Sequence, residues 1–139
     1  MVNQSLLEQM GFETSEIKFI LNLSNQNKLL CNFIQPIISE NKILIGNDGC
    51  YPIHVLPTGV FIQIENKLNL LNSSLKKLIQ LIEYYEKIYS KEAENLSDNE
   101  MDERVYFHIE QLKKIDPIAF QDTNSHWSCI ADEMIAGHL

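Results

Sequence analysis

Hydrophobic residues change their period near the middle of the chain, from the spacing of strands to the spacing of helices. Between residues 43 and 71, apolar side chains alternate with polar or turn-forming ones, as at Ile53 and Val55, and this two-residue period is typical of half-buried β-strands. Turn-forming residues interrupt the alternation at 47–49, 57–59 and 65–67. Because such short connections leave no room for a helical crossover, we predict an antiparallel meander of four short strands.

The N-terminal segment, residues 3–34, contains both a helical and a strand-like spacing of apolar residues. Residues 3–10 predict a short helix that ends at Gly11, where a left-handed residue can stop it. Apolar residues then occupy every second position from 17 to 23, which favours a strand. A second strand is expected over residues 29–34, and Pro36 limits how far it can continue inside a sheet.

From residue 72 onward, the apolar residues follow a helical period. A first helix is expected after a cap at Asn72 or Ser73, with an apolar stripe made of Leu75, Leu78, Ile79, Ile82, Tyr85, Ile88 and Tyr89. A second stripe ends at Asp116-Pro117 and comprises Val105, Ile109, Leu112 and Ile115. A last helix is expected between a cap at Asn124 or Ser125 and a stop at Gly137.

Strands in the first half and helices in the second indicate an α+β fold, with an antiparallel sheet packed against a helical C-terminal half. We find no internal repeat and no linker, so residues 1–139 are expected to form a single domain. The inward positions of these elements predict one core, formed by Ile45, Ile53, Val60, Ile62, Leu75, Leu78, Ile82, Ile109, Leu112, Trp127, Ile130 and Met134.

The acidic composition narrows the expected partners. Eleven Lys and Arg against nineteen Asp and Glu leave a net charge of −8, whereas affinity for nucleic acids comes mainly from basic residues. We therefore expect no nucleic-acid binding and a positively charged protein partner. The chain shows no secretory signal, and its apolar runs are far shorter than the roughly 20 residues that span a bilayer, so we expect a cytoplasmic protein without membrane contact.

Few residues suggest catalytic or metal chemistry. Cys31, Cys50 and Cys129 are widely spaced, which argues for a reducing compartment and against a disulfide framework. His126 and Cys129 could share a metal ion on a helix, but a structural zinc needs four ligands and no second close pair completes the set. We expect no metal, no cofactor and no enzyme activity. A small hydrolase using His126 and Cys129, or the acids described next, is the enzymatic alternative, and a buried Cys129 would argue against it.

An acidic stretch over residues 90–103 interrupts the helical stripes with six acids and one lysine. We expect a loop there, either a solvated connector or a patch that docks a basic protein. Recognition often sits on loops held by a rigid scaffold. The candidate partner-binding residues are these acids and one aromatic side chain from the preceding helix: Glu92, Glu94, Asp98, Glu100, Asp102, Glu103 and Tyr84.

A series of short motifs, taken in order, points to a family. The motifs are Ile43-Leu44-Ile45-Gly46-Asn47-Asp48-Gly49, Pro57-Thr58-Gly59-Val60, Asn72-Ser73-Ser74-Leu75, Asp116-Pro117 and the segment from Trp127 to Gly137. Together they resemble the SUKH superfamily of bacterial immunity proteins, most closely its fourth subgroup, over most of the chain.

The resemblance implies a curved antiparallel sheet with packed helices, and a role as a cytoplasmic immunity protein in a polymorphic toxin system. Such a protein would bind and neutralise a cognate toxin of nuclease or nucleic-acid deaminase type, without catalysis and without a cofactor. A basic toxin would suit the acidic chain, because nuclease surfaces that hold phosphate are basic. The alternative is a non-catalytic regulatory or scaffold module on the same fold, which binds an endogenous protein.

Overall fold

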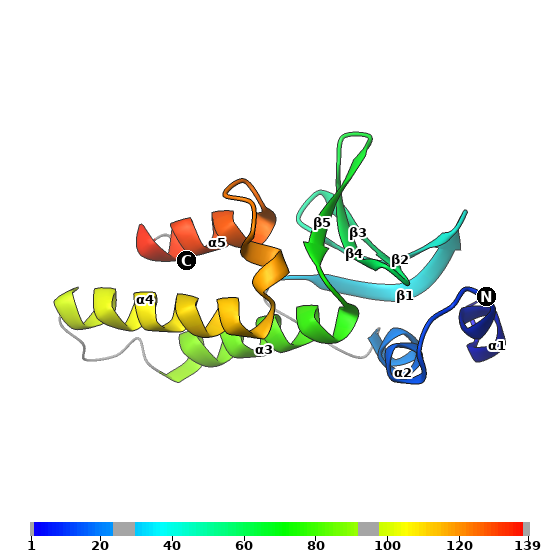
Figure 1. Ribbon diagram of the computed structural model, residues 1–139, viewed down its shortest axis with the longest axis horizontal. Helices are drawn as coiled ribbons and strands as arrows, with labels where there is room; N and C mark the ends of the chain where they lie inside the picture. The colour runs from blue at the N-terminus through cyan, green and yellow to red at the C-terminus, as the bar shows by residue number, and fades with distance from the viewer. Residues whose placement is uncertain (1, 24–29, 92–97, 138–139) are drawn as a thin grey trace.

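The chain forms a five-stranded antiparallel sheet with helices packed on its inner face (Figure 1). The computed structural model describes residues 2–23, 30–91 and 98–137, except for the side chains of residues 89–91 and 98–102. In chain order, the elements are α1 (Gln4–Gln9), α2 (Thr14–Asn22), β1 (Asn32–Ser39), β2 (Lys42–Asp48), β3 (Tyr51–Leu56), β4 (Gly59–Ile64), β5 (Lys67–Asn72), α3 (Leu75–Lys91), α4 (Asp98–Ile115), the 3-10 helix η2 (Pro117–Phe120) and α5 (His126–Ile135).

The sheet is a meander, in which each strand pairs with the next one along the chain in the order β1-β2-β3-β4-β5. Ile53 lies opposite Ile62 and Val55 lies opposite Val60, and all four side chains are buried on the inner face. The register shifts between β1 and β2, between β2 and β3, and between β4 and β5, and such bulges increase the local twist. The predicted α+β fold and its antiparallel meander are therefore confirmed, with β1 as a fifth strand.

The strand expected over residues 17–23 is wrong, because this segment lies in and just after helix α2. Ile17, Ile20 and Leu23 are buried, at three-residue intervals that place them on one helical face. Leu21, which alternation would bury, is 39% exposed. Ile20 does not fit the two-residue alternation, but it fits the buried face of a helix. The apolar residues here are therefore compatible with a strand period and with a helical period, and tertiary packing selects the helix.

The first strand also differs from its expected position at 29–34, since β1 runs from Asn32 to Ser39 and passes through Pro36. β1 is an edge strand, and its pairing with β2 skips from Phe33 to Ile37. A proline at an edge or a bulge removes no ladder hydrogen bond. Pro36 is therefore accommodated inside the strand instead of ending it.

The turn between β2 and β3, predicted at residues 47–49, begins later than predicted. Strand β2 continues through Asp48, so the turn consists of Gly49 and Cys50, with Gly49 at a left-handed φ of 62°. Gly46 lies within the strand, where a Cβ would come within 2.1 Å of the backbone oxygen of Asn32. Gly46 therefore permits the close approach of β1 to β2 and does not form the turn.

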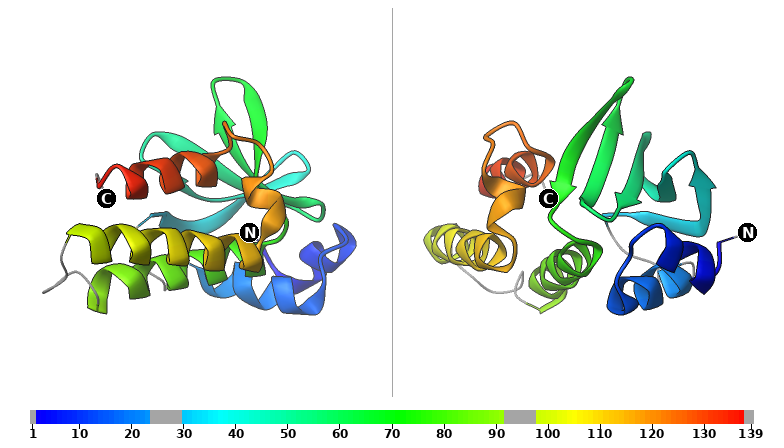
Figure 2. Two further views of the ribbon diagram at one scale, coloured as in Figure 1. Left: turned by 60° about the vertical axis from the view of Figure 1, so that its left-hand side comes forward. Right: turned by 45° about the vertical axis from the view of Figure 1, so that its right-hand side comes forward.

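The helical half matches the predicted periods. Helices α3 and α4 run antiparallel, and α4 contacts both α3 and α5 (Figure 2). Ser125 caps α5 by accepting a hydrogen bond from the backbone N–H of Ser128. The predicted core residues are all buried, from Ile45 in β2 to Met134 in α5. Within the described residues, no helix is long and apolar enough to cross a membrane.

The expected loop over residues 90–103 is partly wrong, because α3 continues to Lys91 and α4 already begins at Asp98. The residues from 98 to 103 are therefore helical. Acidic residues are favourable near a helix N-terminus, where the backbone N–H groups carry partial positive charge, so this charge run is compatible with the start of a helix. Residues 92–97 lie outside the described residues.

A buried polar junction ties the sheet to the last two helical segments. The Asn72 side chain donates to Asp116 Oδ2 at 2.8 Å and accepts a hydrogen bond from Trp127 Nε1 at 2.9 Å. The backbone N–H of Ser73 donates to the same carboxylate oxygen at 3.0 Å. The motifs that begin at Asn72, Asp116 and Trp127 thus meet at one point. Each supplies a hydrogen-bond partner for a buried polar group of another motif.

Candidate functional site

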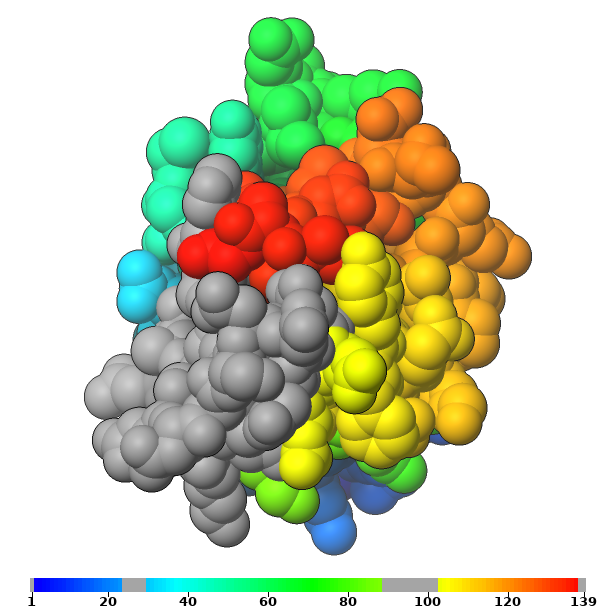
Figure 3. All heavy atoms as spheres, turned by 90° about the vertical axis from the view of Figure 1, so that its left-hand side faces the viewer, coloured from blue at the N-terminus to red at the C-terminus, as the bar shows by residue number. Residues whose placement is uncertain are grey.

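The exposed face of α4 carries the two most solvent-exposed large hydrophobic side chains of the described residues, Tyr106 at 56% and Phe107 at 54%. Glu103 and Glu110 lie one helical turn before and after this pair, so all four share one face of the helix. We call these four residues the α4 stripe. Figure 3 shows α4 in yellow at the surface, next to α5 in red.

The opposite face of α4 explains why the stripe points outward. His108, Ile109 and Leu112 are buried against the rest of the molecule, which fixes the rotation of the helix about its axis. Adjacent aromatic residues at 106 and 107 must then face solvent. Exposed aromatic side chains are common anchors of protein–protein interfaces, so the stripe is the leading candidate for a partner contact.

The acidic residues predicted to bind a partner fall partly beside this stripe. Asp98, Glu100, Asp102 and Glu103 belong to the first six residues of α4, directly before the aromatic pair. Glu103 is exposed, whereas the side chains of the other three lie outside the described residues, as do Glu92 and Glu94 entirely. The helix therefore includes one predicted acid, Glu103, in the stripe. The other three belong to the first one and a half turns of α4, directly before it.

Glu110, at the other end of the stripe, forms an exposed ion pair with Lys113, with an N–O distance of 3.7 Å. Exposed pairs of this kind contribute little to stability. Glu110 therefore remains available to exchange Lys113 for a basic group on a partner.

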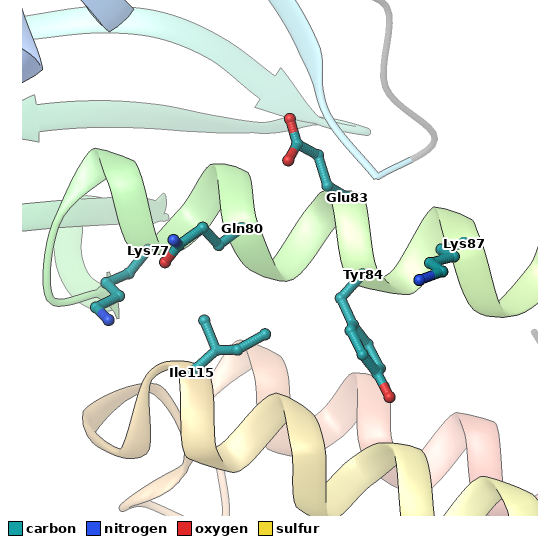
Figure 4. A pocket seen from close by; sticks show the side chains of 6 residues that line it. All are labelled: Lys77, Gln80, Glu83, Tyr84, Lys87 and Ile115. Carbon is teal, nitrogen blue, oxygen red and sulfur yellow. The ribbon is translucent and has the colours of Figure 1, made fainter.

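Tyr84, the predicted aromatic contact, is half-buried between α3 and α4. Its hydroxyl lies 2.8 Å from His108 Nδ1, and the two rings meet edge to face with centroids 5.7 Å apart. Tyr84 therefore holds the two helices together and also lines a surface groove, whose other lining residues are Lys77, Gln80, Glu83, Lys87 and Ile115 (Figure 4).

His126 and Cys129, the pair weighed above as the metal-binding and hydrolase alternatives, gain no complete set of metal ligands within the described residues. His126 Nε2 contacts Asp48 Oδ2, which fastens the start of α5 to the end of β2. Cys129 is exposed, so the burial that would argue against a reactive thiol is not observed. Within the described residues, no group of three His, Cys, Asp or Glu side chains is placed to hold a metal ion.

Two buried titratable groups lie elsewhere in the sheet and its approach. Burial raises the pKa of the Cys31 thiol to about 12, and the nearby Asp48 carboxylate adds to this shift. Burial lowers the pKa of His54, with Lys42 acting in the same direction, although a hydrogen bond to Gln63 opposes the shift. The His54 Nε2–Gln63 Oε1 distance is 2.9 Å, and His54 Nδ1 has no hydrogen-bond partner among the residues that the structure describes. Both groups are uncharged near neutral pH and are structural in character.

The sequence prediction missed Tyr106 and Phe107, although the signal was present. Val105, Ile109 and Leu112 define the buried face of the helix, and the same spacing leaves positions 106 and 107 on the opposite side. A search of the exposed face for aromatic residues would have found both.

Comparison of the chain with protein-family models, curated proteins and solved structures found no match.

Proposed function

We propose that this chain is an immunity protein that binds a cognate toxin of nuclease or nucleic-acid deaminase type and neutralises it by direct contact, without catalysis. The observation that carries the proposal is the α4 stripe, an exposed Tyr106–Phe107 pair beside an acid-rich helix start, on a chain with a net charge of −8. The resemblance to SUKH immunity proteins supports the same reading.

The stripe supplies both components that such an inhibitor needs. Aromatic side chains bury a large area at a low entropic cost, and they account for much of the binding energy where they enter a pocket of the partner. Acidic residues around them attract a basic surface and raise the association rate. A toxin that acts on nucleic acid presents such a basic surface, so an acidic inhibitor can occupy the position of the substrate.

The alternative is a regulatory or scaffold module that uses the same stripe to bind a basic endogenous protein. Both functions require the same contact chemistry, and they differ in the identity of the partner. The gene next to this one separates them, because an immunity protein is encoded beside its toxin.

The direct test is co-expression of the chain with the toxin domain encoded by the neighbouring gene. We expect the chain to protect the host cell, to co-purify with the toxin domain and to abolish its activity on nucleic acid in a stoichiometric mixture. A toxin domain that stays fully active and unbound in the presence of the chain would exclude the immunity function.

A pair of variants tests the stripe within that complex. Tyr106→Ser with Phe107→Ser is expected to weaken toxin binding by at least 2 kcal/mol, that is about 30-fold, because hot-spot aromatics each cost about that much when truncated. The control is Ile37→Ser, which alters a side chain that is 52% exposed on the edge strand β1. Binding measured by titration calorimetry should be unchanged in the control, and equal losses in both variants would contradict the assignment.

A further inference from the structure

The groove between α3 and α4 is lined by residues that have no role in the proposed function. Its volume is about 460 Å³, which falls within the range of small-ligand and peptide sites. Four of its lining residues, Lys77, Gln80, Tyr84 and Lys87, follow one face of α3, and Ile115 of α4 supplies an apolar contact across from them (Figure 4).

The lining carries a lysine at each end and one acid, Glu83, a helical turn before Lys87. Lys77 and Lys87 are ten residues apart in α3, which separates their positions by about 15 Å along the helix axis. Within the described residues, the Lys77 ammonium group forms no ion pair. Glu83 also lines the groove, but Figure 4 shows its carboxylate directed away from Tyr84 and Ile115.

The antiparallel arrangement of the two helices strengthens the positive charge at one end. The start of α3 carries Lys76 and Lys77, and the end of α4 carries Lys114 and Lys113, the latter paired with Glu110. Lys77 and Ile115 line the same groove, so two lysine pairs that are far apart in sequence lie at the same end of the helix pair. This positive region stands out on a chain whose net charge is −8.

We propose that the groove binds an acidic, extended segment of a partner protein. An extended peptide advances about 3.3 Å per residue, so two acidic residues four or five positions apart span the distance from Lys77 to Lys87. An apolar side chain between them would lie against Ile115 and the ring of Tyr84, while the Gln80 amide can hydrogen-bond the peptide backbone. This partner differs in charge from the basic toxin, so the inference is independent of the proposed function.

Charge also decides against a nucleic acid as the occupant. A polynucleotide extends well beyond the groove and meets the acidic remainder of the surface, whereas a short peptide contacts only the lysines and the apolar floor. At physiological ionic strength the Debye length is about 8 Å, so the more distant acids repel a short ligand weakly.

The test is fluorescence anisotropy at physiological salt with a labelled peptide that has two leucines flanked on each side by two glutamates. Wild type should bind it, and the same peptide with glutamine in place of glutamate should not bind. Lys77→Gln with Lys87→Gln should weaken binding about five- to tenfold, as expected for the loss of two charge contacts that solvent screens.

The matched control is Lys18→Gln with Lys67→Gln, which removes two exposed lysines from α2 and β5 and should leave the affinity unchanged. The inference is overturned if wild type does not bind the acidic peptide, or if both double variants lose affinity equally. Tighter binding of a single-stranded oligonucleotide than of the peptide, with the same dependence on Lys77 and Lys87, would also overturn it.

Discussion

Trp127 anchors the last helix through its ring and through its indole N–H. The side chain is 2% exposed, its ring lies 6.3 Å from that of Phe120 between centroids, and Nε1 donates to Asn72 Oδ1. Trp127→Ala should therefore lower the free energy of unfolding by about 3–5 kcal/mol, because it leaves a large cavity. Urea unfolding followed by circular dichroism measures this change, and a nearly unchanged midpoint would show that α5 is peripheral.

A conservative variant separates the two contributions of this residue. Trp127→Phe keeps much of the packing but leaves Asn72 Oδ1 without its donor, which should cost about 1–3 kcal/mol. A loss as large as that of the alanine variant would indicate that the hydrogen bond, and not the packing of the ring, accounts for most of the stability that Trp127 provides.

The three cysteines should differ sharply in reactivity. Cys50 and Cys129 are exposed, whereas Cys31 is buried with its pKa raised to about 12. Because the thiolate is the reactive form, iodoacetamide at pH 8 should label Cys50 and Cys129 in the folded chain and leave Cys31 unmodified until urea unfolds it. Mass spectrometry of peptides identifies each site, and rapid labelling of Cys31 in the folded state would contradict its burial.

The same shift has a consequence for stability at high pH. The folded-state pKa of Cys31 lies above the ordinary value of 9.0 for the thiol, so the folded state holds the proton more tightly. The contribution is fully present below about pH 9 and is lost as the pH rises toward 12. Cys31→Ser should reduce this alkaline loss, measured as the fall in unfolding free energy between those two pH values.

At the scale of the elements, Gly46 is the position where β1 and β2 approach most closely. A Cβ there would meet the Asn32 oxygen at 2.1 Å and the Phe33 Cα at 3.0 Å, and backbone atoms of a paired strand cannot move aside individually. Gly46→Ala should therefore destabilise the fold by about 1–3 kcal/mol or more. Gly49→Asn is the control, because the space around Gly49 is open and Asn tolerates its positive φ. An equal midpoint for both variants in urea unfolding would contradict this reading.

The elements also show what sequence periodicity can determine. The meander and the C-terminal helices were predictable because turn residues separate the strands and because the helical stripes are long. Helix α2 was not, since five apolar residues between 17 and 23 satisfy both a two-residue and a helical period. Only the packing of Ile17 and Ile20 into the core selects the helix.

The candidate site was predictable in part for a related reason. The acidic run is visible in the sequence, and its charge suggested a contact surface before any fold was known. Its helical start at Asp98 and the outward rotation of Tyr106 and Phe107 depend on how α4 packs against α3 and α5. The meeting of Asn72 and Asp116 likewise requires two segments 44 residues apart to fold together, which no local pattern specifies.

At the scale of the whole molecule, the sequence of the α3–α4 pair places acidic and basic residues at opposite ends of α4. Acids cluster at the start of α4, while Lys113 and Lys114 lie at its end beside the start of α3. A basic partner approaching this pair meets an attractive field at one end and a repulsive one at the other. The acids should therefore orient the partner and act mainly on the rate of association.

Neutralising the acidic run tests this division, by replacing each of its acids with Asn or Gln: Glu92, Glu94, Asp98, Glu100, Asp102 and Glu103. At low salt, the association rate constant for the proposed toxin partner, measured by stopped flow, should fall by about tenfold or more. The dissociation rate should change less, because the aromatic pair of the stripe remains. Raising the salt should reduce the difference between variant and wild type, since screening weakens the attraction that the acids provide.

The control replaces six exposed acids elsewhere, so that both variants carry the same net charge: Glu8, Glu13, Glu40, Glu65, Asp132 and Glu133. If the position of the acids matters, the control variant should associate with the partner faster than the variant with the neutralised acidic run, whenever both are measured at low salt. Equal rates for the two variants would mean that only the total charge of the molecule acts on the partner. An unchanged rate in the first variant would leave the acidic run as a solvated segment with no part in docking.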